Sequence, residues 1–163
     1  MATAPLGLLS EPLARLRTML AESTAFQQWT GTADATAALA HIHLLSSARK
    51  PALPVCLLDL GEQFERTRTT ILNGSRFESA GHLVAYFRAV VPDGTDDLDA
   101  VYTFTNHLGA VWRDLEALAG TNGRLGITAI SLAVPPTRIE ADRRQYGGDL
   151  FEAALSCAVR LSP

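Results

Sequence analysis

His41 and His43 are the two side chains whose spacing comes closest to that of a metal site. Residues two apart in a strand share one face, so both imidazoles would point the same way. A zinc site in a protein takes three or four ligands, and no cysteine or third histidine lies near this pair in the sequence. Asp59 would have to be brought close by the fold, and His82 and His107 belong to other predicted elements. We therefore expect two histidines on an exposed strand face, with no metal and no other cofactor.

The sequence contains no recognisable catalytic nucleophile or phosphate-binding loop. Cys56 lies in an apolar run, where a thiol is usually inert, and there is no G-x-S-x-G sequence. The G-x-x-x-x-G-K-[ST] and G-x-G-x-x-G loops are also absent. Asp96, Asp97 and Asp99 stand at the start of a predicted helix, where acids serve as caps and interact with the helix dipole. These patterns predict a protein that is not an enzyme.

A small enzyme remains an alternative interpretation of the same residues. A thioesterase-like fold wraps a curved sheet around one long helix, and residues 96–119 predict such a helix beside apolar strands. An enzyme of this kind needs a carboxylate or histidine facing a pocket at a dimer interface. Asp59, Asp97 and His107 are the candidates, and none of them lies in a recognisable motif. A host-encoded adaptor or ligand-binding domain is the other alternative.

Two charged segments are better candidates for function than any single residue. The segment 137–149 is long for a connection between strands, and long charged loops in compact domains are often functional. It mixes both signs of charge, which favours protein contact over phosphate binding. The polar, threonine-rich segment 64–70 is the second candidate surface. The residues that we expect at a subunit interface are Arg66, Arg68, Arg138, Glu140, Asp142, Arg143, Arg144 and Tyr146. A solvated hairpin arm without a partner is the alternative for the longer segment.

Composition is that of an ordinary globular domain. The chain has 163 residues, 47% of them hydrophobic and 19% charged, with a formal net charge of −3. This balance does not predict disorder, and the slight negative charge gives no reason to expect general affinity for nucleic acid. Cys56 and Cys157 both lie in apolar runs and are expected to be buried free thiols. No signal peptide or membrane-spanning run is apparent, so we expect a soluble protein made in a cytoplasm.

Apolar periodicity predicts helices in three places. Leucines spaced by three and four residues predict a first helix, whose regular part is expected to begin near Pro12. Residues 34–40 predict a short second helix. Thr95 is expected to cap the third, long helix, which runs from Asp96 to Ala119 and stops at Gly120. Its expected buried stripe is Leu98, Val101, Leu108, Val111, Leu115 and Leu118.

Alternating or continuous apolar runs predict strands before and after the long helix. The expected strands are 41–45, 55–60, 64–70, 82–91, 125–134 and 151–161, with a turn at Asn73-Gly74 and a closing Pro135-Pro136. Hairpins combined with helices indicate an α+β fold, a two-layer sandwich in which a mostly antiparallel (mixed) sheet packs against the N-terminal helix and the long helix. We expect one domain over residues 1–163, with projecting arms near 61–80 and 135–149.

The layout of these segments resembles a known group of viral proteins. An N-terminal helix is followed by RKPALPVCLLDL, an arm, GHLVAYFRAVVP, one long helix, LGITAISLAVPP and a closing GGDLFEAALSCAVRL. This order is similar to that of the tail terminator and tail-to-head joining proteins of long-tailed bacteriophages. The resemblance implies a ring of identical subunits, commonly a hexamer, that caps the tail tube and offers a surface to the neck connector proteins of the head. It also implies a protein of the virion tail or neck with no membrane contact, through whose lumen DNA passes without sequence-specific binding.

Overall fold

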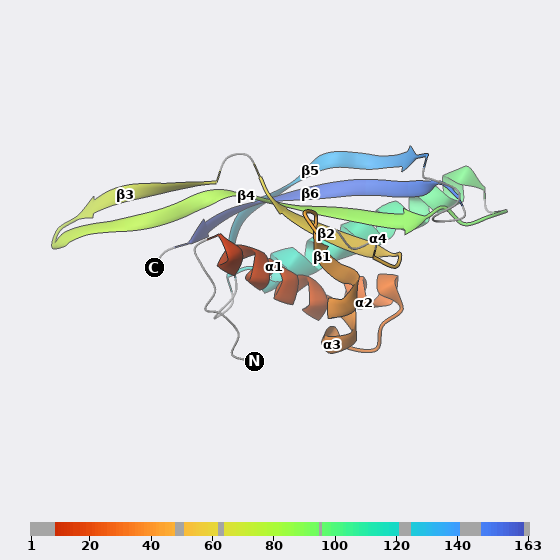
Figure 1. Ribbon diagram of the computed structural model, residues 1–163, viewed down its shortest axis with the longest axis horizontal. Coiled ribbons are helices and arrows are strands. Elements are labelled where there is room, and N and C mark those ends of the chain that lie inside the picture. Colours follow the sequence, from red (N-terminus) through yellow and green to blue (C-terminus); the bar gives the residue numbers. More distant parts are fainter. Residues whose placement is uncertain are drawn as a thin grey trace.

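In the described residues, six strands form one mixed sheet, and helices pack against one of its faces (Figure 1). The computed structural model describes residues 9–47, 51–61, 64–94, 96–120, 125–140 and 148–161. The strands are β1 (Ile42–Leu44), β2 (Val55–Leu60), β3 (Glu65–Ile71), β4 (Gly74–Val90), β5 (Gly126–Ile139) and β6 (Leu150–Leu161). Their order in the sheet is β1-β2-β4-β6-β5, and β3 pairs with the first part of β4. Among these strands only the β1–β2 pair is parallel, so the predicted two-layer α+β architecture with a mostly antiparallel sheet is confirmed.

Side-chain caps set the beginnings of three of the helices. The helices are α1 (Ser10–Glu22), α2 (Thr24–Thr30), α3 (Ala35–Ala38) and α4 (Asp97–Leu118), and a short 3₁₀ turn spans Leu39–His41. Ser23, Asp34 and Asp96 accept hydrogen bonds from the first turns of α2, α3 and α4. Helix α2 was not predicted. Its signals are Ser23 before it and Gly31 after it, the latter in the left-handed region with φ of 69°.

The core lies between the sheet and the helices and follows the predicted alternation. Leu83, Ala85 and Phe87 of β4 point toward the helices and are buried. In β6 the same face carries buried Phe151, Ala153, Leu155, Cys157 and Val159. Their register places both sets side by side across the β4–β6 pair. An aromatic cluster fills the space under α4 and consists of Phe26, Trp29, Phe87, Phe104 and Phe151.

The predicted buried stripe of α4 is wrong at its beginning. Leu98 is 57% exposed, and the buried positions of the first turns are Ala100 and Phe104. A residue two positions before Ala100 lies roughly 200° around the helix from it, on the opposite face. Leu108, Val111 and Leu115 are buried as predicted.

Two strands are longer than predicted. β5 continues through Pro135-Pro136 to Ile139, with an irregular register between Val134 and Thr137. Proline is tolerated there because β5 is an edge strand, whose outer N–H groups need no partner in the sheet. The predicted arm near 135–149 therefore begins as paired strand. β4 likewise starts at Gly74, well before the predicted residue 82.

Cys56 and Cys157 are buried free thiols, as predicted. Burial, with a smaller contribution from Cys157, raises the pKa of the Cys56 thiol well above its ordinary value. Burial also raises the pKa of Cys157 from 9.0 to about 12. Both thiols are thus held in the neutral, unreactive form.

Candidate functional site

The first part of β4 and the whole of β3 form an arm that projects beyond the sheet (Figure 1). We use the word arm for residues 65–80. β6 ends opposite Ser79, so β3 and residues 74–78 of β4 continue as a ribbon of two strands. The turn at its tip is formed by Leu72 and Asn73, and Gly74 follows with φ of 143°, a conformation that favours glycine. A turn is present as predicted, but it lies one residue before Asn73-Gly74, because Gly74 already pairs with Ile71.

Register divides the arm into two faces of different charge. One face continues the helix-covered side of the sheet and carries Arg66, Arg68, Thr70, Ser75, Phe77 and Ser79. This cationic face contains no acid. The other face carries the ion pair of Arg76 with Glu78 at 2.6 Å, together with Glu65. The predicted interface residues Arg66 and Arg68 therefore lie together, on one side of the arm.

Local contacts hold both arginines in place on the cationic face. The Arg66 guanidinium lies 5.1 Å from the centre of the Phe77 ring, which is a cation–π contact. The Nε of Arg68 donates a hydrogen bond of 2.9 Å to Ser75 Oγ. Within the described part of the chain, neither arginine forms a salt bridge. Their charges are therefore available to a partner.

The tip of the arm is apolar as well as exposed. Leu72 is fully exposed, and Ile71 and Phe77 are exposed by about half. A large apolar side chain gains nothing from full contact with water. Exposed apolar groups on a projecting element commonly mark a contact surface. Sequence analysis missed these three residues, although they interrupt an otherwise polar segment.

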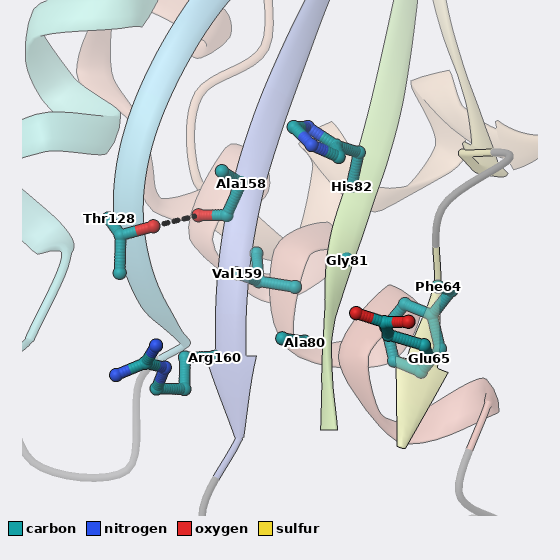
Figure 2. A pocket seen from close by; sticks show the side chains of 9 residues that line it. All are labelled: Phe64, Glu65, Ala80, Gly81, His82, Thr128, Ala158, Val159 and Arg160. Atoms are coloured by element: carbon teal, nitrogen blue, oxygen red, sulfur yellow. Dashed lines mark hydrogen bonds between the residues drawn. The ribbon is translucent and has the colours of Figure 1, made fainter. Parts of the chain in front are cut away.

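A hollow of about 660 Å³ lies at the root of the arm, on the sheet face opposite the helices. Figure 2 shows Arg160 of β6 and Glu65 of β3 on either side of Ala80, and the register pairs Ala80 with both. His82 lies above them, and its Nδ1 is 3.2 Å from Ser156 Oγ. The hollow has no cysteine or serine among its lining residues. It brings the acidic Glu65 and the basic Arg160 to the root of the arm without a strong nucleophile.

The second predicted interface segment is only partly described. Arg138 lies in β5 and forms ion pairs of 2.8 Å with Asp97 at the start of α4 and with Asp149 before β6. The hydrogen bond that Arg138 Nε donates to Asp149 is the main cause that raises the pKa of Arg138. Arg138 thus ties β5 to α4 within one chain, and Glu140 is exposed next to it. Asp142, Arg143, Arg144 and Tyr146 lie outside the described residues.

The histidine pair is engaged with the backbone. His41 Nδ1 donates to the carbonyl of Pro54 at 2.8 Å, and His43 Nε2 donates to the carbonyl of Ala40 at 2.9 Å. Over the described ranges, no group of three or more histidine, cysteine, aspartate or glutamate side chains could hold a metal ion. None of the helices in those ranges is long and apolar enough to cross a membrane.

The three residues weighed for a thioesterase-like site lie apart. Asp59 is exposed on β2, where it alternates with the buried core residue Leu58. Asp97 is held by Arg138 at one end of α4. His107 is half-buried on the sheet side of α4, beside the aromatic cluster. The sheet separates Asp59 from His107, so the fold does not bring the three candidates together in one thioesterase-like site.

Comparison with known proteins finds similarity among solved structures. No family model and no curated protein matches this chain. Among solved structures, the chain is similar to one described as the virion of a native gene transfer agent particle. The two share 11% sequence identity with a TM-score of 0.43, and the match covers 98% of this chain and 100% of that one.

Proposed function

We propose that this chain is a structural subunit of a phage-type virion, a tail terminator that forms a ring on the tail tube and joins it to the head. In this proposal the subunit catalyses no reaction. Its partners are other copies of itself, the tail tube protein and the neck connector proteins. The support from sequence is the order of segments shared with tail terminators.

The arm is the observation that carries the proposal. An isolated ribbon of two strands is marginally stable in water, because it buries little apolar surface. Here such a ribbon also exposes Leu72, Ile71 and Phe77 and presents a cationic face. An element of this kind is stabilised when a neighbouring subunit covers it. Closed rings need this type of contact, in which one surface of a subunit meets a different surface of the next.

The formal net charge of −3 is compatible with a DNA passage. A lumen that lets DNA slide must not hold phosphates tightly, and a slightly acidic subunit avoids general attraction to them. Arginines on the arm then serve contact between proteins.

Electron microscopy of tail tubes provides the test. Purified protein is mixed with tubes of the tail tube protein encoded in the same gene cluster and imaged by negative stain. We expect a ring on one end of each tube and an arrest of tube growth. A variant that lacks residues 67–78, with Arg66 joined to Ser79 by an Asn-Gly turn, should keep the helical signal of its circular dichroism spectrum and lose the ring. Tubes that stay bare with the intact protein would contradict the proposal.

A further inference from the structure

The first two turns of α4 expose apolar side chains that no other described element covers. Leu98 and Tyr102 are each 57% exposed. Four residues separate them, so they lie above one another on one face of the helix. Asp99 is exposed beside them and Asp96 precedes them. We call these four residues the α4 end surface.

This surface is strongly acidic for its size. Between Arg88 and Arg113 the only charged residues are four aspartates, at positions 93, 96, 97 and 99. Arg138 pairs with Asp97, and Asp96 caps the helix through the N–H of Leu98. Asp99 has neither an ion pair nor a hydrogen bond among the interactions of the described residues. Negative charge thus surrounds the two exposed apolar side chains.

The cationic face of the arm is complementary to the α4 end surface. It carries Arg66 and Arg68 around the half-exposed Phe77 and has no acid. An aromatic ring flanked by cations would meet a tyrosine and a leucine flanked by carboxylates. The cationic face and the α4 end surface therefore complement each other both in apolar contact and in charge.

The two surfaces lie at opposite ends of the molecule. Figure 1 shows the arm at one end of the long axis and the beginning of α4 at the other. The arm cannot reach the α4 end surface of its own chain. A contact between the two must therefore join different copies head to tail, which repeats around a ring.

We propose that the arm of one copy binds the α4 end surface of the next copy, with Phe77 against Leu98 and Tyr102 and with Arg66 and Arg68 facing Asp96 and Asp99. This inference rests on the proposed function, since it names the contact between subunits of the ring. The occupant of the α4 end surface is a second copy of this chain.

Mixing two assembly variants tests the direction of the contact. The arm variant Arg66→Glu/Arg68→Glu and the α4 variant Leu98→Ser/Tyr102→Ser should each weaken self-association on the order of tenfold or more. Mixed together they should form dimers that contain one copy of each and do not grow, because each dimer joins the intact arm to the intact α4 end surface. Light scattering measures the mass. The control Arg76→Glu/Glu78→Arg reverses a pair on the opposite face of the arm and should assemble like the wild type.

Photo-cross-linking identifies the surface that the arm contacts. With benzoylphenylalanine in place of Phe77 in the full chain, mass spectrometry should find cross-links to residues 97–106 of another copy. Mixing light and nitrogen-15-labelled chains shows that the link joins two copies. Cross-links to a different surface, or none, would overturn the inference, as would variants that assemble normally while circular dichroism shows them folded.

The same sample separates this inference from the proposed function. Tubes that are capped without a link from position 77 to α4 would refute the contact and leave the tail terminator proposal standing. A link without capping would support the contact and refute the tail terminator. Neither result would refute both.

Discussion

Asp114 joins two parts of the chain that are far apart in sequence, and its removal should cost more stability than its partial exposure suggests. Its Oδ2 accepts a hydrogen bond of 2.7 Å from Ser23 Oγ and one of 2.9 Å from the N–H of Ala25. Ser23 is 1% exposed and also caps α2 through the N–H of Phe26. A single carboxylate thus fixes the start of α2 against α4.

The expected loss follows from the bonds removed. A hydrogen bond to a charged group contributes about 1.5–3 kcal/mol to the free energy of unfolding. Asp114→Ala removes two such bonds and leaves a buried donor without an acceptor. We expect the free energy of unfolding to fall by about 3 kcal/mol. This is the low end of the summed contribution of two bonds, because the carboxylate is partly exposed. Ser23→Ala removes one of these bonds together with a cap that contributes about 1 kcal/mol, which gives a similar loss.

A double-mutant cycle measures the shared bond. Since both single variants remove the Ser23–Asp114 bond, the double variant should lose less than the sum of the two by about 1.5 kcal/mol. Urea unfolding followed by circular dichroism gives each free energy. Glu116→Ala is the control on the same helix, because this exposed acid accepts a bond only from Nε1 of the partly buried Trp112 among described residues. It should change stability by about 0.5 kcal/mol or less. Additive losses, or an Asp114→Ala variant as stable as the control, would refute the reasoning.

Two further predictions concern the core. Leu108 is 6% exposed, so Leu108→Ala should lower the free energy of unfolding by about 2–5 kcal/mol. Leu98 is 57% exposed, so Leu98→Ala should change it by about 0.5 kcal/mol or less. Equal losses by urea unfolding would contradict the observed orientation of α4. Burial raises the pKa of Cys157 from 9.0 to about 12, so the folded chain keeps a proton that the unfolded chain loses in this range, and stability should fall as pH rises from 9.0 to about 12. The slope should approach about 1.4 kcal/mol per pH unit for this thiol and should become shallower in Cys157→Ala, and a flat profile in the wild type would count against the buried thiol.

Local patterns in the sequence were sufficient to identify most elements. β2 spans residues 55–60, as its continuous apolar run predicted, and its first four residues are all buried. β6 runs to Leu161, as predicted, because one of its faces lies in the core and side chains alternate along a strand. The short helix after Asp34 was predicted from its alanines, and the turn at the arm tip was predicted from Asn73-Gly74, one residue after its observed position. These signals depend on a few neighbouring residues, so sequence alone is enough to read them.

Sequence analysis also selected Arg66 and Arg68, but it could not place them. Their spacing by two in a predicted strand puts them on one face, but it does not say which residues of the neighbouring strand join them there. The pairing of Arg68 with Phe77 and of Arg66 with Ser79 assembles the cationic face, and it depends on the register of β3 with β4. The first part of β4 was not predicted as strand for a related reason. It has no buried face, so its side chains show no apolar alternation.

The remaining features depend on contacts between distant segments. In the sequence, Pro135-Pro136 predicts the end of a strand. The strand continues past these prolines because β5 lies at the edge of the sheet. The burial of Phe104 instead of Leu98 depends on which side of α4 meets the sheet. Ser23 and Asp114 are 91 residues apart, so no local pattern could relate them. Sequence determined the local conformations of this protein through periodicity and capping, whereas tertiary packing decided which faces are buried and which charges meet, because those depend on the partners that folding brings together.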